Sequence, residues 1–101
     1  HYGDTDTAIR FNGDDTITAE TGGSERLRID SGGRLLLGTT TEGHAAGDNL
    51  TVADAGNSGI TIRSGTSNNG VLYFSDGTSG SAEYRGAVQY NHTDNYLSAR
   101  H

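Results

Sequence analysis

The sequence predicts an all-β fold built from short antiparallel strands, and three observations carry this prediction. Apolar residues alternate with polar ones in short runs, which is the period of a strand with one buried face. Pairs such as Asn12-Gly13 and Gly22-Gly23, which supply the positive φ of tight hairpin turns, separate the runs. No window of about eleven residues carries the apolar stripe of an amphipathic helix, so we expect no helix.

The alternating runs predict about nine strands per chain, most of them about four to eight residues long. In chain order they cover residues 7–11, 15–20, 25–30, 34–37, 49–53, 59–63, 71–75, 83–90 and 95–100. Further turn signals lie at Gly32-Gly33, Gly56-Asn57, Asn69-Gly70, Asp76-Gly77 and Asp94-Asn95. Short strands separated in this way are typical of a meander, sandwich, prism or solenoid.

The chain is poor in residues that can form a core. Val, Ile, Leu and Phe together make up 17 of the 101 residues, and the net charge is −6, a composition that borders on that of disordered chains. The alternation argues against disorder, because the apolar residues fall on one side of each run. We therefore expect the chain to obtain its core by associating with copies of itself.

The side chains expected in this shared core are the apolar members of the predicted strands. They are Ile9, Phe11, Ile17, Leu27, Ile29, Leu35, Leu37, Leu50, Val52, Ile60, Ile62, Leu72, Phe74 and Val88. Arg10, Arg28 and Arg63 are expected to pair with carboxylates of neighbouring chains. Composition also divides the chain into an N-terminal β module, residues 1–43, and a C-terminal β module, residues 44–101, which carries most of the Tyr residues.

The residue types that are missing exclude several classes of site. The chain has no Cys and no Lys, so it has no thiol nucleophile, no Cys-ligated metal, no P-loop lysine and no Ser–Lys pair. Its acidic balance argues against nucleic-acid binding, and no apolar run is long enough for membrane insertion. Glu83 with Asp76 or Asp94 is a formal glycosidase pair, but spacing in the sequence does not give the distance between two carboxylates. We expect no enzyme activity and no cofactor.

Two groups of residues are candidate metal ligands. The four His residues lack the spacing of a metal site, although a three-fold axis would bring copies of one of them together. The acidic cluster near the start lacks the order of a calcium loop, and Asp in turns usually bonds to its own backbone. We expect no metal at either group: His1, His44, His92 and His101, or Asp4, Asp6, Asp14 and Asp15.

The Tyr residues of the second module offer a binding hypothesis. Aromatic rings on a β surface are a usual platform for sugars, but Tyr on strands is also ordinary interface packing with its hydroxyl in water. The candidates for contact with a glycan are Tyr84, Arg85, Tyr90, Asn91 and Tyr96.

Two stretches of the sequence resemble a known family. Residues 20–40, ETGGSERLRIDSGGRLLLGTT, are similar to a stretch common in tail-fibre proteins of marine phages, with Leu35-Leu36-Leu37 where a Gly is expected between aliphatic residues. Residues 56–98, from GNSGITIRSG to HTDNYLS, resemble a companion module that often precedes a chaperone domain of the endosialidase type. The chain holds no such domain, and without Lys the self-cleavage of that domain is not assigned here.

The resemblance implies a viral structural protein: a homotrimeric tail-fibre shaft of the virion, with a β-prism or β-helix-like arrangement, that supports host attachment. Its partners would be two further copies, other tail or virion proteins, and host cell-surface polysaccharide, and its location would be the virion at the host surface. Two alternatives stay open. The second module is itself a carbohydrate-binding receptor-recognition module, or the chain is part of a bacterial extracellular adhesin or filament.

Overall fold

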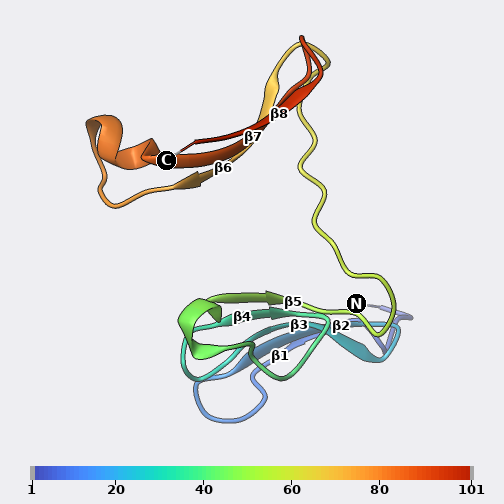
Figure 1. The fold of residues 1–101 in the computed structure, drawn as a ribbon. Helices are drawn as coiled ribbons and strands as arrows, with labels where there is room; N and C mark the ends of the chain where they lie inside the picture. Colours follow the sequence, from blue (N-terminus) through green and yellow to red (C-terminus); the bar gives the residue numbers. More distant parts are fainter. Residues whose placement is uncertain (1, 101) are drawn as a thin grey trace. The chain divides into compact units, whose positions relative to one another are not determined.

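The computed structural model describes residues 2–100, and this part of the chain is all-β, with eight strands in two sheets and two short 3-10 helices. The chain forms two compact units, His1–Ile60 and Thr61–His101, each with one sheet (Figure 1). The boundary expected between residues 43 and 44 lies inside the first unit, in the connection between its last two strands.

The first unit holds a five-stranded sheet in the order β1-β2-β3-β4-β5. Its strands are β1 (Ala8–Arg10), β2 (Ile17–Thr21), β3 (Ser24–Ile29), β4 (Leu35–Leu37) and β5 (Leu50–Val52). The first four strands form an antiparallel meander, whereas β5 pairs with β4 in parallel. The prediction of antiparallel strands is therefore wrong for β5.

The turn between β2 and β3 shows why the meander forms. Thr21 pairs with Ser24, and Gly22 and Gly23 between them have φ of 57° and 76°. Two successive positive φ angles define a type I′ turn, whose twist matches that of the strands it joins, and Gly adopts them without steric cost. The Gly22-Gly23 turn signal of the sequence is confirmed here.

The register of the first sheet places its aliphatic residues on one side. Residues directly opposite each other in neighbouring strands project to the same face. One row across the sheet contains Ile9, Ala19, Leu27, Leu37 and Val52, and a second contains Ile17, Ile29, Leu35 and Leu50. We call these nine residues the aliphatic face.

The opposite side of the same sheet is covered by the chain itself. It carries Thr18, Arg28, Leu36 and Thr51, which also lie opposite one another in the register. Leu36 is fully buried and Thr18 almost so. The cover is the crossover, residues 38–49, which contains the 3-10 helix η1 (Ala45–Gly47) and whose Gly43 N–H donates to Thr51 Oγ1 at 3.1 Å.

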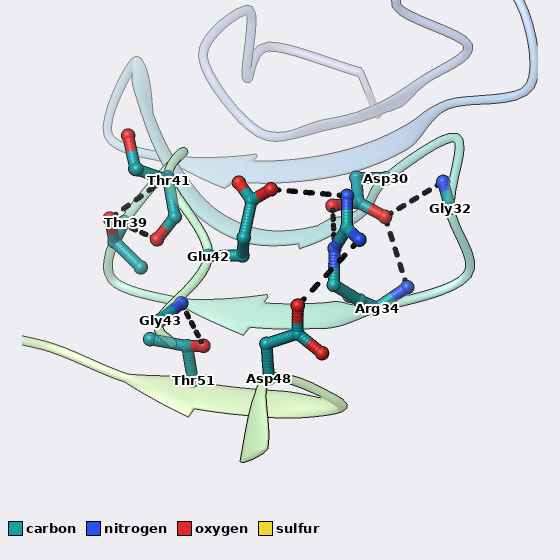
Figure 2. Close-up of polar contacts among 9 residues, drawn as sticks. All are labelled: Asp30, Gly32, Arg34, Thr39, Thr41, Glu42, Gly43, Asp48 and Thr51. Atoms are coloured by element: carbon teal, nitrogen blue, oxygen red, sulfur yellow. Dashed lines mark hydrogen bonds and ion pairs between the residues drawn. The ribbon is translucent and has the colours of Figure 1, made fainter. Parts of the chain in front are cut away.

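Arg34 attaches this crossover to the sheet, as Figure 2 shows. Its guanidinium lies 2.8 Å from Asp30 Oδ2, 3.3 Å from a Glu42 carboxylate oxygen and 3.7 Å from Asp48 Oδ2. Glu42 and Asp48 belong to the crossover, whereas Asp30 belongs to the turn between β3 and β4. A parallel pair needs a connection of about a dozen residues, and these contacts hold that connection against one side of the sheet.

The second unit holds an antiparallel sheet in the order β6-β7-β8. Its elements are β6 (Asn69–Phe74), the 3-10 helix η2 (Gly80–Tyr84), β7 (Gly86–Asn91) and β8 (Tyr96–Arg100). One face carries Leu72, Phe74, Val88, Tyr90 and Leu97, and the other carries Tyr73, Ala87, Ser98, Arg100 and Tyr96.

Three local expectations are wrong in the second half of the chain. Residues 59–63 form no strand, because no neighbouring segment pairs with them in the structure. Asn69-Gly70 is not a turn but the start of β6, where both residues pair with β7. The strand expected from residue 83 begins only at Gly86, since Glu83 and Tyr84 lie in η2.

Candidate functional site

The aliphatic face of the first unit is exposed. Its six most exposed members, Ile9, Ile17, Ile29, Leu35, Leu37 and Leu50, have relative accessibilities of 37% to 74%. Together these six residues present roughly 500 Å² of accessible surface, within the range of the largest apolar patches on monomeric proteins, about 300–600 Å². Patches of this size on a soluble protein mark places where another molecule binds. This face is the first candidate site.

The chain has almost no apolar core of its own. In residues 2–100, Leu36 and Ala87 are the only buried hydrophobic residues. A domain of this size normally buries a contiguous set of large side chains in order to offset its conformational entropy. The aliphatic face is therefore the largest reserve of apolar surface in the first unit that is still available for burial.

The apolar face of the second unit is also accessible. Its Leu72, Phe74, Val88, Tyr90 and Leu97 have relative accessibilities of 38% to 69%. An open groove of about 430 Å³ runs along it, lined by Leu72, Val88, Tyr90 and Leu97 together with Ile62 and His92. The shared core predicted from the sequence includes Leu72, Phe74 and Val88 of this face, but not Tyr90 or Leu97.

The residues expected in the shared core have distinct positions in the structure. Eight of them, Ile9, Ile17, Leu27, Ile29, Leu35, Leu37, Leu50 and Val52, lie on the aliphatic face, and Leu72, Phe74 and Val88 lie on the apolar face of the second unit. Phe11 follows β1, and Ile60 and Ile62 lie in the segment without regular structure; all three are exposed.

Arg10 and Arg28 form ion pairs with carboxylates of their own chain, whereas the sequence predicted that they pair with carboxylates of neighbouring chains. Arg10 lies 3.0 Å from Glu20, and Arg28 lies 2.7 Å from Glu25. In a regular strand Glu25 and Arg28 would project to opposite faces, being three residues apart. A register shift at Ala19/Glu20 forms a β-bulge, and it lets Glu25 bind Arg28 on the covered side of the sheet. No ion pair within residues 2–100 involves Arg63.

The residues expected to contact a glycan do not form one surface. Tyr90 lies on the apolar face of the second unit, whereas Tyr96 and Asn91 lie on the opposite face. Asn91 Oδ1 accepts hydrogen bonds from Thr93 N at 2.9 Å and Asp94 N at 3.1 Å, so this side chain stabilises the β7–β8 turn. Tyr84 and Arg85 lie at the other end of β7, in and after η2.

A different aromatic cluster forms around Tyr84. The ring of Tyr73 lies 6.2 Å from that of Tyr84, and the guanidinium of Arg100 lies 5.8 Å from the Tyr84 ring centroid. Arg85, which is 3.5 Å from Asp76, borders a hollow of about 310 Å³ with Ser81, Tyr84 and Arg100. We call Tyr73, Tyr84, Arg85 and Arg100 the tyrosine–arginine cluster.

Sequence reasoning missed half of this cluster. Tyr73 and Arg100 are both opposite Ala87 in the register, from the two strands that flank β7. They are 27 positions apart in the chain. A correct alignment of the three strands would have found the pair, because Ala87 is too small to separate the two long side chains.

Within the described residues, the candidate metal ligands do not gather into one site. Within residues 2–100, no three His, Asp or Glu side chains lie close enough to hold a metal ion. His44 Nδ1 accepts a hydrogen bond from Ala46 N at 3.0 Å and caps η1. The ring of His92 packs against that of Tyr90, with 4.9 Å between the ring centroids. Asp4 accepts hydrogen bonds from Asp6 N and Thr7 Oγ1, and Asp6, Asp14 and Asp15 are exposed or half-exposed turn residues. His1 and His101 lie outside the described residues.

Comparison with known proteins gives no match: no family model, no curated protein and no solved structure is similar to this chain. In the part of the chain that the structure describes, no helix has the length and apolar character needed to cross a bilayer.

Proposed function

We propose that this chain is a structural segment of a homotrimeric fibre, of the kind that forms the shaft of a phage tail fibre, and that it has no catalytic activity. The two stretches at residues 20–40 and 56–98 support the family, since they resemble tail-fibre modules. In this role the chain would connect other virion proteins to the part of the fibre that contacts the host surface.

One observation carries the proposal: the aliphatic face is exposed although the chain lacks a core of its own. Its two rows contain no charged side chain, whereas Glu20 of β2 and Glu25 and Arg28 of β3 form ion pairs on the other side. A sheet that is polar and covered on one side and aliphatic and open on the other is suited to burial against identical sheets. Association would also cover sheet edges that are otherwise open to aggregation.

The mass of the 101-residue chain in solution tests this proposal. Light scattering on a sizing column should give three times 10.6 kDa in a single folded species. Leu27→Asp and Leu37→Asp place a charge at opposed positions in the centre of the aliphatic face and should abolish the trimer. Asn12→Asp, which adds the same charge in the exposed β1–β2 turn, should leave the mass unchanged. A wild-type chain that is folded and monomeric would contradict the proposal.

The tyrosine–arginine cluster supports a second candidate function, the recognition of host-surface carbohydrate. The Tyr84 ring and two guanidinium groups line one hollow, with the Tyr73 ring 6.2 Å from that of Tyr84, and they offer stacking surface and hydrogen-bond donors to a sugar. Tyr73 and Arg100 lie on the face of the sheet opposite Leu72 and Val88, so the cluster would stay accessible if the apolar face were buried in a fibre.

Binding of purified host polysaccharide to the chain tests this second function. Tyr84→Ala and Arg100→Ala should each weaken binding at least tenfold, while Tyr96→Ala, at the other end of the sheet, should not. If all three variants bind as the parent does, the cluster is not the site. If the parent binds no polysaccharide of any tested host, the candidate function is wrong.

A further inference from the structure

The aliphatic face of the first unit is a narrow strip. Across the strands it extends over all five, from Ile9 on β1 to Val52 on β5, which is about 19 Å at the usual strand separation. Along the strands it is only two rows wide, about 7 Å between residues i and i+2. The strip is therefore almost three times longer across the strands than along them.

The ends of the strands prevent the strip from becoming wider. β1, β4 and β5 have three residues each, so the aliphatic residues occupy nearly their whole length. The turns beyond the strands are polar or glycine-rich, with Gly22-Gly23 after β2 and Ser31-Gly32-Gly33 after β3. Copies that bury this face must therefore meet along the long direction of the strip.

We infer that, in the assembled protein, the strands of the first unit run across the symmetry axis, and that both aliphatic rows run parallel to it. The occupant of the face is a second copy of the same chain, and the inference rests on the proposed homotrimer. The area argues for this occupant: three copies with roughly 500 Å² each would bury about 1,500 Å² in total, which lies within the range of specific interfaces. With three copies, each strip is covered on both flanks by the strips of the other two.

A specific contact pattern follows from this geometry. A three-fold axis places each residue at the same height as its own copies, and rows that are parallel to the axis also keep every residue of a row at the same distance from it. Ile9 then faces Ile9, Leu27 faces Leu27, and Val52 faces Val52. If the strands ran along the axis, only the central strand would lie near it. The edge strands β1 and β5 would then meet those of the neighbouring copies, and Ile9 would lie near Val52.

Cysteine cross-linking of the full chain separates the two geometries, since the parent sequence contains no Cys. The variants are Ile9→Cys, Leu27→Cys and Val52→Cys, each treated with a short bismaleimide. Self-linked dimers on a denaturing gel are expected from all three. Arg10→Cys, next to Ile9 but on the opposite face, is the matched control and should give at least tenfold less dimer.

The outcomes distinguish this inference from the proposed function. If the protein is trimeric but only Leu27→Cys links to itself, and the Ile9→Cys/Val52→Cys double variant links between its two positions, the inference is overturned while the trimer stands. A monomeric mass with no cross-link overturns both. Nitroxide labels at the same three positions give a second measurement without a bond-forming step: equal label-to-label distances support the inference, and distances that grow from Leu27 toward both edges contradict it.

Discussion

Arg34 donates to the Asp30 carboxylate twice, through its backbone N–H to Oδ1 at 3.0 Å and through its guanidinium to Oδ2 at 2.8 Å. The first bond closes the β3–β4 turn, in which Gly32 N–H donates to the same Oδ1 at 3.0 Å. The second aims the guanidinium at Glu42 and Asp48 of the crossover. One carboxylate thus fixes both a local turn and the direction of the side chain that holds a more distant segment.

Replacing Arg34 with Ala should release the crossover from the sheet. Glu42 and Asp48 then lose their shared cation, and nothing replaces it on that side. We expect a lower melting temperature and faster amide hydrogen exchange at residues 38–49, Gly43 and Gly47 in particular. Arg26→Ala is the control, because within the described residues the Arg26 side chain bonds to Thr21 Oγ1 and forms no ion pair with the crossover, and its backbone bond to Gly38 is kept in the variant. Equal exchange in the two variants would show that Arg34 does not hold this segment.

Stability should fall in acid. Hydrogen bonds from the Arg34 backbone N–H and guanidinium hold the pKa of Asp30 below its ordinary value, and hydrogen bonds from Arg28 lower the pKa of Glu25 in the same way. A carboxyl whose folded pKa is depressed stabilises the protein fully above its unfolded pKa, about 4, and loses that contribution as the pH falls through the folded pKa. The free energy of unfolding, measured by denaturant titration between pH 7 and 2, should be constant at first and then fall below about pH 4.

Asp30→Asn and Glu25→Gln identify the groups responsible for this decline. Each variant lacks one titrating carboxyl, so its stability at pH 7 should be lower and its decline in acid shallower than that of the parent. Asp14→Asn, in the exposed β1–β2 turn, should follow the parent curve. A parent-like acid decline in both Asp30→Asn and Glu25→Gln would assign the pH dependence to other groups.

Gly38 should not tolerate a side chain. It has φ of +80°, and a Cβ there would collide with the carbonyl oxygen of Ala53, in the segment that leaves β5. Neither the backbone of Gly38 nor that of Ala53 has room to move, since Gly38 N–H bonds to Arg26 O and Ala53 N–H bonds to Leu37 O. We expect Gly38→Ala to cost roughly 3 kcal/mol or more in the free energy of unfolding, from strain and overlap together.

Gly33→Ala provides the matched comparison for Gly38. Gly33 has a similar φ of +84°, but no atom lies within 4 Å of the position its Cβ would take. Its substitution should cost only the backbone strain, about 1–2 kcal/mol. Similar losses at the two positions in chemical denaturation would mean that the approach of Gly38 to Ala53 is unimportant.

If the chain is a homotrimer, its melting temperature should depend on concentration. Folding coupled to association is stabilised by mass action, whereas the stability of a monomer is independent of concentration. For an enthalpy of about 0.7 kcal/mol per residue, a tenfold increase in concentration should raise the melting temperature by about 5 °C. Calorimetry at two concentrations measures this directly. An unchanged melting temperature would argue for a monomer.

The first three strands of the first unit were predictable because they alternate and are followed by turns that contain glycine. The rows through Leu27 and Ile29 follow directly from that alternation. The parallel pairing of β5 was not predictable, because the polar crossover carries no periodic signal. The burial of Leu36 was hidden for the same reason: it depends on the crossover that covers it, and in the sequence Leu36 is only the middle of three leucines.

The second unit was harder to predict, and its candidate binding residues were the hardest part to predict. Asn69-Gly70 has the composition of a hairpin turn, yet β7 extends far enough to pair with it. Ile60 and Ile62 alternate as a strand does but find no partner strand, because alternation reports a possible face and not a neighbour. The tyrosine–arginine cluster depends on the register of three strands, which fixes Tyr73 and Arg100 on either side of Ala87.

The meander connectivity has a kinetic consequence. In both sheets each strand pairs with the strand next to it along the chain, and β4 and β5 differ only in being parallel and joined by a longer crossover. Such local contacts give a low contact order and rapid hairpin formation, within microseconds for a single hairpin. Subunit encounter takes milliseconds to minutes and depends on concentration. If the chain is a homotrimer, transient hairpins thus form long before copies meet, which makes encounter the rate-limiting step of assembly and gives refolding a reaction order above one.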